Sequence, residues 1–380
     1  MIVAGEASGD AHAAALVRAI QDAAGAEVCE FFGSTGPLMR AAGVESIIRS
    51  DDLAILGLLE IGRALPRFWR AYRQLKRAAI ERQPDAVILV DWPDFNLRLA
   101  RSLHRRGTKI IYYISPQLWA WRPHRIRNVR RDVDLLISIL PFEKDWYAAR
   151  GMTHVAYVGH PMAGRLNPKY GREEFCRQND LDPSRPIVAL LPGSRHKELS
   201  RILPEMLGSA AVVWQRRPEV QFVIPLAAGR DPEEARQLIA AKHLDSRLQS
   251  PIRVTRHETI EALAAADVAA VASGTATLEA ALVGTPLVIV YKESALNWHT
   301  LGRLITADHY GLVNLIAGRR MVTELMQNDF TAECLAEELM RLLDPDCNRT
   351  LRAELRQIAE SLGDAGASRR AAELVINTIR

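Results

Sequence analysis

Residues Asp267–Ala280, "DVAAVASGTATLEA", hold an apolar run of strand length that breaks at Ser273-Gly274-Thr275 and continues as a helical pattern. The passage from strand to helix through glycine and hydroxyl side chains predicts a βα unit. A helix N-terminus offers unpaired N–H groups and a partial positive charge, so the turn suits a phosphate group. An ordinary βα turn, with Ser or Thr as the N-cap residue, explains the same residues.

Strand-length apolar runs of this kind recur along the chain. They lack polar alternation and are bounded by Pro, Gly or Asp, which is typical of strands buried on both faces. Helical stretches separate them, so we predict parallel sheets with helices on both sides. The runs lie at residues 2–4, 85–95, 109–116, 134–142, 155–162, 187–194, 221–227, 252–255, 267–274 and 286–292. A Gly/Ser turn at 5–9 and a helix over 10–24 are expected after the first run.

The chain has 380 residues, which is more than one ordinary core organises. A polar stretch with Pro, Asn and Gly near residues 160–170 separates two sets of strands. We therefore expect an α/β protein with two doubly wound parallel-sheet domains facing a central cleft. The expected domains span 1–165 and 166–345, and C-terminal helices over 346–380 are expected to pack back across them.

Bulk composition excludes several protein classes. Hydrophobic residues at 48% and charged residues at 25% are normal for a globular protein, and a net charge of +4 gives no argument for nucleic acid as a partner. The four cysteines are scattered, without a CxxC pair, and no His cluster has metal-ligand spacing. We expect no metal site, no signal peptide and no membrane span, since no apolar run reaches about 20 residues.

Polar and glycine-rich residues follow the predicted strands in both halves. In open parallel sheets, ligands bind beyond the carboxyl ends of the strands. This distribution predicts a ligand held in a cleft between the two domains. The segments that follow strands are 5–10, 91–96, 116–122, 192–198 and 273–275.

The chain also carries an ordered set of motifs: "GEASGD", "PDFN", "SPQLWAWR", "LPFE", "GHPM", "LLPGSR", "SGTATLEA" and "NLIAGRRMVTELMQ". In this order, over nearly the whole chain, they resemble the lipid-A-disaccharide synthase family. The resemblance implies a GT-B glycosyltransferase that joins UDP-2,3-diacylglucosamine to 2,3-diacylglucosamine 1-phosphate (lipid X) through a β-1,6 bond and releases UDP. It implies an inverting, metal-independent reaction without a cofactor, in the cytoplasm at the inner face of the bacterial membrane.

Two departures from the family pattern are visible. Leu312-Val313-Asn314 stands where the family often has Leu-Pro-Asn. The "GSR" loop continues as His196-Lys197-Glu198, which adds a histidine and a cation near the expected phosphate site, with roles left open.

The resemblance places the UDP-sugar donor on the C-terminal domain. There, glycine permits a close backbone approach, while hydroxyl and arginine side chains suit phosphate. Glu279 is expected to accept hydrogen bonds from the ribose hydroxyls, and its alternative is a solvated helix carboxylate. The expected donor residues are Gly193, Ser194, Arg195, Ser273, Gly274, Thr275, Thr277, Glu279 and Asn314.

An inverting transfer needs a base that takes the proton of the acceptor hydroxyl. Asp91 follows a predicted buried strand in the N-terminal domain and is the favoured base. Asp94 is the second candidate, with a helix N-cap as its alternative role. Glu6 is expected to contact the sugar or its phosphate. Asp10 is a candidate cap, and the lone histidines His12 and His160 are expected to be structural.

Residues 53–77 form a basic amphipathic segment with aromatic side chains, which favours binding to an anionic membrane surface. A core-facing helix with solvated arginines explains the same pattern. Arg122 follows the "WAW" motif and is a candidate ligand of the acceptor phosphate. The residues expected at the acceptor and the membrane are Leu59, Ile61, Leu65, Phe68, Trp69 and Arg122.

Two rival functions remain open on this scaffold. A UDP-sugar epimerase resembling UDP-N-acetylglucosamine 2-epimerase would keep the nucleotide site without needing the basic, apolar 53–77 segment. A UDP-sugar-binding regulator or peripheral membrane scaffold would need no base. A homodimer is compatible with the sequence.

Overall fold

The computed structural model describes residues 1–25, 29–53, 61–120, 122–227, 229–241, 252–293 and 309–380, with the side chains of residues 52, 53 and 61–65 outside this description. The chain divides into two compact units. Residues 1–161 and 362–380 form the N-terminal unit, and residues 162–361 form the C-terminal unit.

The N-terminal unit alternates strands and helices, as the apolar runs predict. Its elements are β1 (Ile2–Val3), α1 (Ala7–Ala24), β2 (Phe32–Thr35), α2 (Pro37–Ala41), β3 (Glu45–Arg49), the 3-10 helix η2 (Ser50–Leu53), α3 (Ile61–Arg82), β4 (Val87–Val90), α4 (Pro93–His104), β5 (Ile110–Tyr113), the 3-10 helix η4 (Pro123–Arg125), α5 (Ile126–Asp132), β6 (Leu135–Ser138), α6 (Pro141–Ala148), β7 (Val155–Tyr157) and α17 (Ala367–Ile379).

Its sheet has seven strands in the order β3-β2-β1-β4-β5-β6-β7, and every pair is parallel. The chain winds outward from β1 to β3 and then returns to β4 on the other side of β1. Val3 of β1 lies opposite Leu89 of β4, so the loops after these two strands emerge side by side. Such a switch point is where open parallel sheets bind ligands.

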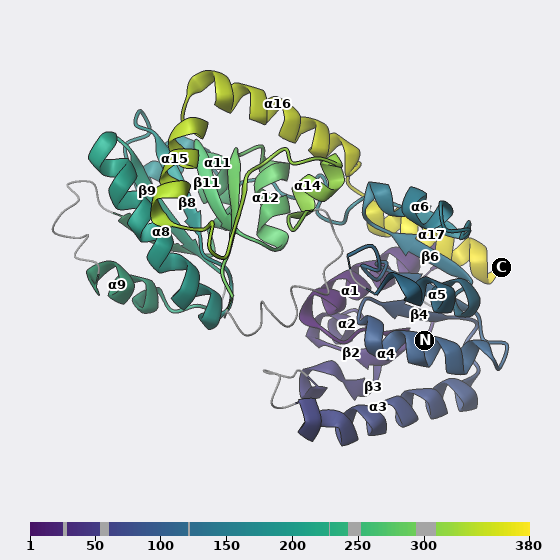
Figure 1. Ribbon diagram of the computed structural model, residues 1–380. Helices are drawn as coiled ribbons and strands as arrows, with labels where there is room; N and C mark the ends of the chain where they lie inside the picture. Colours follow the sequence, from purple (N-terminus) through teal and green to yellow (C-terminus); the bar gives the residue numbers. More distant parts are fainter. Residues whose placement is uncertain (26–28, 54–60, 121, 228, 242–251, 294–308) are drawn as a thin grey trace. The chain divides into compact units, whose positions relative to one another are not determined.

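The two faces of this sheet have separate cores. One core joins the strands to α3, α4, α5 and α6, and includes Leu75, Leu99 and Tyr147. The other joins them to α1, α2 and α17, and includes Leu16 and Val375. Figure 1 shows α17, in yellow, at the C-terminal end of the chain, within the N-terminal unit. The last helix therefore completes the first unit.

The C-terminal unit repeats the same architecture. Its elements are α7 (Arg172–Gln178), β8 (Ile187–Leu191), α8 (His196–Arg216), β9 (Gln221–Leu226), α9 (Pro232–Ala241), β10 (Ile252–Arg256), α11 (Thr259–Ala265), β11 (Val268–Ala272), α12 (Thr275–Val283), β12 (Leu287–Tyr291), α14 (Leu312–Ala317), β13 (Glu324–Met326), α15 (Ala332–Leu342) and α16 (Pro345–Ser361).

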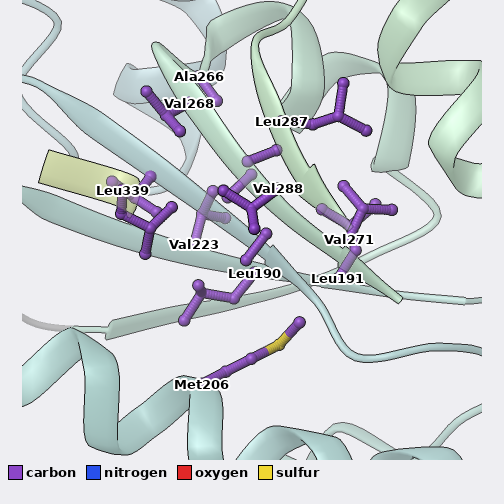
Figure 2. Packing of buried hydrophobic residues seen from close by; sticks show 14 of the residues in the cluster. Leu190, Leu191, Met206, Val223, Ala266, Val268, Val271, Leu287, Val288 and Leu339 are labelled. Carbon is purple, nitrogen blue, oxygen red and sulfur yellow. The ribbon is translucent and has the colours of Figure 1, made fainter. Parts of the chain in front are cut away.

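Its six strands lie in the order β10-β9-β8-β11-β12-β13, again all parallel. The switch point falls between β8 and β11, where Leu191 lies opposite Val271. Figure 2 shows side chains of the central strands packed together with Met206 of α8 and Leu339 of α15. Because these strands are covered on both faces, their sequences are continuously apolar.

The predicted fold class is confirmed: both units are α/β with parallel sheets, and the C-terminal segment is helical. The local details differ in places. Ala7, Ser8 and Gly9, expected in a turn, already belong to α1. The units divide at Pro161/Met162 and Ser361/Leu362, compared with the expected boundaries after 165 and 345. The reason is that α16 packs in the C-terminal unit, whereas α17 packs on α1.

Candidate functional site

The loops after β1 and β4 form the first candidate site, at the switch point of the N-terminal sheet. Gly5 belongs to the first loop and Trp92 to the second. A Cβ atom at Gly5 would lie only 2.1 Å from the indole ring of Trp92. Glycine is therefore required at this position because the ring lies directly against the backbone.

Asp91, the favoured base, has an unusual backbone. Its φ angle is +48° and that of Trp92 is +50°, in the left-handed region that costs non-glycine residues energy. Side chains of the neighbouring elements hold this turn. The Asp91 carbonyl accepts hydrogen bonds from the Asn96 amide at 2.7 Å and from the Tyr112 hydroxyl at 2.6 Å. These hydrogen bonds fix the backbone of the turn at the end of β4. Backbone strain of this kind clusters at functional sites.

The Asp91 side chain is half-buried, and burial raises its pKa above the ordinary value. The negative charge of Glu6 raises that pKa further, while a backbone N–H of Trp92 lowers it. Glu6 itself is exposed at the N-cap position of α1. The fold thus brings the two predicted carboxylates together, and a raised pKa makes Asp91 a stronger base.

Asp94 has a different environment. It is exposed in the first turn of α4, and its Oδ1 accepts from Arg122 at 3.2 Å and from Arg125 at 2.5 Å. The alternative role of Asp94 as an N-cap is wrong, since Trp92 occupies that position and no side chain caps the helix there. Asp94 instead holds two arginines of the loop after β5 beside the start of α4.

Asp10 is a capping residue, but of α2. Its buried carboxylate accepts from the backbone N–H groups of Gly36, Leu38 and Met39, at 3.0, 2.8 and 3.0 Å. His160 is buried, and burial, followed by the charge of His12, lowers its pKa to about 4. It is therefore neutral at physiological pH.

Glu143 is a buried acid that the sequence reasoning did not single out, although it lies in the "LPFE" motif. It is 1% exposed, and its Oε1 accepts from the Trp119 indole at 3.0 Å. Burial raises its pKa to about 7, although N–H donors including Trp119 and Leu140 lower it. Close by, the Tyr147 hydroxyl is 3.0 Å from Ser115 Oγ. These contacts tie the loop after β5 to both ends of α6.

In the C-terminal unit, the loop after β11 opens as the "SGTATLEA" pattern predicts. Gly274 has a φ of +156° with open space around its Cα, and Gly274 and Thr275 are exposed at the N-terminus of α12. Ser273 is half-buried. Thr277 is fully buried and its hydroxyl donates to the Gly274 carbonyl at 2.8 Å. Gly274 and Thr275 are thus accessible to a ligand, whereas Thr277 shapes the turn.

Glu279 lies one helical turn after Thr275, on the same face of α12. It is half-buried, and burial raises the pKa of its carboxyl group above the ordinary value. A solvated helix carboxylate would be fully exposed. The structure therefore disfavours that alternative and leaves Glu279 beside the open turn.

The loop after β8 lies at the same switch point, and its polar groups form hydrogen bonds with one another. Glu198 Oε2 accepts from the backbone N–H groups of Ser194 and Arg195, at 2.9 and 3.1 Å, and Gly193 makes room for this side chain with a φ of +108°. The Arg195 guanidinium donates to Glu198 Oε1 at 3.1 Å and is 82% exposed. His196 pairs with Glu234 at 2.6 Å. Glu198 was not predicted to shape this loop.

Asn314 differs from its expected role as a donor contact. It is fully buried. Its Nδ2 donates to the Val322 carbonyl and to Glu324, and its Oδ1 accepts from the N–H groups of Met321 and Val322, all at 2.8 to 2.9 Å. A side chain amide makes at most four such bonds, so no group is left for a ligand. Asn314 holds the segment before β13 in place.

The residues expected at a membrane lie on or before α3. Leu59 and the side chains of Ile61 and Leu65 fall outside the described residues. Phe68 is half-buried against the core of the N-terminal unit, and its ring lies 5.9 Å from that of Trp92. Phe68 therefore faces the sheet, as the core-facing alternative predicts. Trp69 is 55% exposed and stacks on Tyr72 with ring centroids 5.3 Å apart.

Among the residues that the structure describes, no three His, Cys, Asp or Glu side chains are grouped closely enough to hold a metal ion. Within the same residues, no helix combines the length and the apolar character needed to cross a bilayer.

Comparison with known proteins adds sequence evidence to this geometry. A family model described as lipid-A-disaccharide synthetase matches residues 1–376. The lipid-A-disaccharide synthase of Geobacter sulfurreducens is 42% identical, covering 100% of this chain and 97% of the relative. That of Trichlorobacter lovleyi is 43% identical with the same coverage.

Solved structures share the fold at low identity. The calicheamicin glycosyltransferase CalG4 aligns with a TM-score of 0.59 at 18% identity, covering 99% of this chain and 96% of that one. UDP-GlcNAc 2-epimerase from Neisseria meningitidis aligns with a TM-score of 0.52 at 11% identity, covering 90% and 87%. The fold is therefore shared by glycosyltransferases and epimerases and does not itself choose between them.

Proposed function

The chain belongs to the lipid-A-disaccharide synthetase family and is a glycosyltransferase of lipid A biosynthesis, and we propose that it transfers 2,3-diacylglucosamine from UDP-2,3-diacylglucosamine to 2,3-diacylglucosamine 1-phosphate. The observation that supports this reaction best is the half-buried Asp91 at the switch point of the N-terminal sheet, held in a strained turn beside Glu6.

In the proposed reaction, Asp91 takes the proton of the acceptor 6-hydroxyl. The oxygen attacks the anomeric carbon of the donor on the face opposite the diphosphate. The bond from that carbon to the diphosphate oxygen breaks, UDP leaves, and the configuration inverts to β. Burial and the neighbouring charge of Glu6 favour the protonated form of Asp91, and so both assist this proton transfer.

The donor site in the proposal is the switch point of the C-terminal sheet. Gly274 and Thr275 are exposed at the N-terminus of α12, where unpaired N–H groups and a partial positive charge suit the diphosphate. Glu279, one turn later, accepts from the ribose hydroxyls. In the proposal, the exposed Arg195 guanidinium leaves Glu198 and donates to phosphate oxygens of the donor instead. Its planar set of N–H donors matches the geometry of phosphate, and such charged hydrogen bonds are strong.

The proposal assigns charge neutralisation of the departing UDP to Arg195 and backbone N–H groups, without a metal ion. Turnover should then persist unchanged in a chelator such as EDTA. Loss of turnover that Mg²⁺ restores would overturn this part of the proposal. On the acceptor side, Arg122 is exposed beside Asp94 and is the proposed contact of the 1-phosphate.

Acyl chains on both substrates require access to lipid, so we place the protein at the inner face of the cytoplasmic membrane, bound peripherally. The exposed Trp69 on α3 supports this placement, because Trp favours the membrane interface. A homodimer remains a prediction that light scattering of the purified protein tests.

Mass spectrometry of products tests the function directly. The protein mixed with both substrates should yield the disaccharide 1-phosphate and UDP in equal amounts. An epimerised UDP-sugar without acceptor consumption would favour the epimerase, and binding without any product would favour a regulator or scaffold.

A further inference from the structure

A basic groove lies between α3 and α4 of the N-terminal unit, outside the switch-point site. Its volume is about 510 Å³. Five cations and two hydroxyl side chains line it: Lys76, Arg98, Arg101, Arg105 and Arg106, with Tyr72 and Ser102. No acidic side chain contributes to the lining.

The cations of this groove have no counter-ion among the residues that the structure describes. The carboxylate on α4, Asp94, pairs with Arg122 and Arg125. Asp134 lies 3.6 Å from His104, the last residue of α4. Arg98 and Arg101 are three residues apart on α4, and Arg105, four residues further on, is the C-cap residue of that helix. Like charges at these spacings repel each other. An anion in the groove would relieve this repulsion.

The position of the groove points to one kind of anion. Tyr72, which lines the groove, stacks on the exposed Trp69, and Trp is enriched where a protein meets lipid head groups. On the other side of α3, a second groove of about 640 Å³ includes Arg49, Arg67 and Arg70 among the eight residues that line it. Cations thus flank α3 on both sides of an exposed indole, a combination that suits an anionic bilayer surface.

We propose that the α3–α4 groove binds the phosphate of an anionic phospholipid head group, with Trp69 at the level of the head groups. The inference rests on the proposed membrane partner and gives it a discrete site. The planar guanidinium groups of the arginines match the geometry of phosphate oxygens. The hydroxyl groups of Tyr72 and Ser102 are further hydrogen-bond donors in the same groove. The groove would hold α3 and α4 against the leaflet.

The test compares two double variants of the full chain with equal loss of charge. Arg101→Gln with Arg105→Gln alters the groove. Arg18→Gln with Arg369→Gln alters exposed arginines on α1 and α17, the helices of the opposite face of the same sheet. Sedimentation with vesicles of phosphatidylcholine containing about one third phosphatidylglycerol measures partitioning, and pure phosphatidylcholine vesicles give the background.

Partitioning of the groove variant should fall about 25-fold, since it loses two cations and each cation near an anionic surface contributes about a factor of five. The control variant should stay close to the unaltered chain. An equal fall in both variants would show diffuse attraction and overturn the site. Inorganic phosphate and a short DNA duplex serve as competing anions. If either displaces the protein from vesicles at micromolar concentration, the groove prefers an anion other than a lipid head group and the proposed site is overturned.

Two further measurements separate this inference from the proposed function. Turnover with substrates dispersed in detergent should be equal for both variants, because the groove lies away from Asp91. Melting temperatures without vesicles should not fall, since the substituted side chains are exposed. If the unaltered chain has normal turnover but does not bind vesicles, the proposed lipid site is wrong, whereas the proposed function is unaffected.

Discussion

Substitution of the buried Glu143 by Gln should change how stability depends on pH. The pKa of Glu143 is about 7 in the folded protein, compared with an ordinary value of 4.5, and burial is the main cause. Folding therefore favours the protonated acid. Its contribution to stability is complete below about pH 4.5 and is lost as pH rises through about 7.

The size of this loss follows from the two pKa values. They differ by about 2.5 pH units, and each unit corresponds to about 1.4 kcal/mol, so the wild-type protein should lose about 3 kcal/mol relative to Glu143→Gln between pH 4.5 and pH 7. Gln cannot ionise but still offers an oxygen to the Trp119 indole. The difference between the two proteins should level off about one pH unit above the folded pKa, near pH 8.

Urea unfolding of both proteins, followed by tryptophan fluorescence from pH 4.5 to pH 8, measures this difference. Glu81→Gln, on the exposed face of α3, is the matched control and should differ from the wild type by less than about 1 kcal/mol throughout. A difference between Glu143→Gln and wild type that stays flat over this pH range would refute the reasoning. It would mean that water or a rearranged loop solvates the carboxylate.

The other predictions concern the two switch points. Asp91→Asn should lower turnover by about two to four orders of magnitude while UDP affinity is retained, as steady-state kinetics and titration calorimetry would show; a near-normal rate would remove Asp91 as the base. Glu279→Ala and Arg195→Ala should each weaken UDP binding by about 1–3 kcal/mol, and unchanged affinity in both would contradict the proposed donor site. Gly5→Ala should destabilise the protein by about 1–3 kcal/mol in thermal or urea unfolding and reduce turnover, because the new methyl group meets the Trp92 ring. An unaltered melting curve would mean that the ring moves freely.

Much of the fold could be predicted because its strands are buried on both faces. Runs such as Val87–Val90 and Leu287–Tyr291 are continuously apolar and mark the central strands directly. The strands that sequence reasoning missed carry weaker signals. β2 contains Gly33 and hydroxyl side chains, β3 is a half-exposed edge strand, and β13 has only three residues. Edge and short strands depend on their neighbours more than on their own composition.

For the candidate site, the sequence predicted which loops lie at the carboxyl ends of strands, but not the hydrogen bonds of the side chains in those loops. The rule that ligands bind at the carboxyl ends of strands located Asp91 and Gly274 correctly at the two switch points. It does not show which side chains the fold itself uses. Asn314 is satisfied by groups seven to ten residues away, and Glu143 by an indole 24 residues earlier. Such pairings arise only once the sheet has formed.

The helix α3 shows why periodicity alone could not decide between membrane and core. An apolar stripe fits either surface, and the aromatic side chains decide the outcome for its described part. Tyr72 packs edge-on against Phe95 at 6.2 Å, and Phe95 stacks on Trp92 at 4.0 Å. Phe68 also reaches Trp92, the residue that follows Asp91 in the strained turn. This part of the stripe therefore supports the loop that carries Asp91, the proposed base, and a polar residue at Phe68 would disturb that loop as well as any membrane contact. The exposed Trp69 lies outside this packing, except for its stack on Tyr72, so a substitution there tests the proposed membrane binding with less effect on the fold.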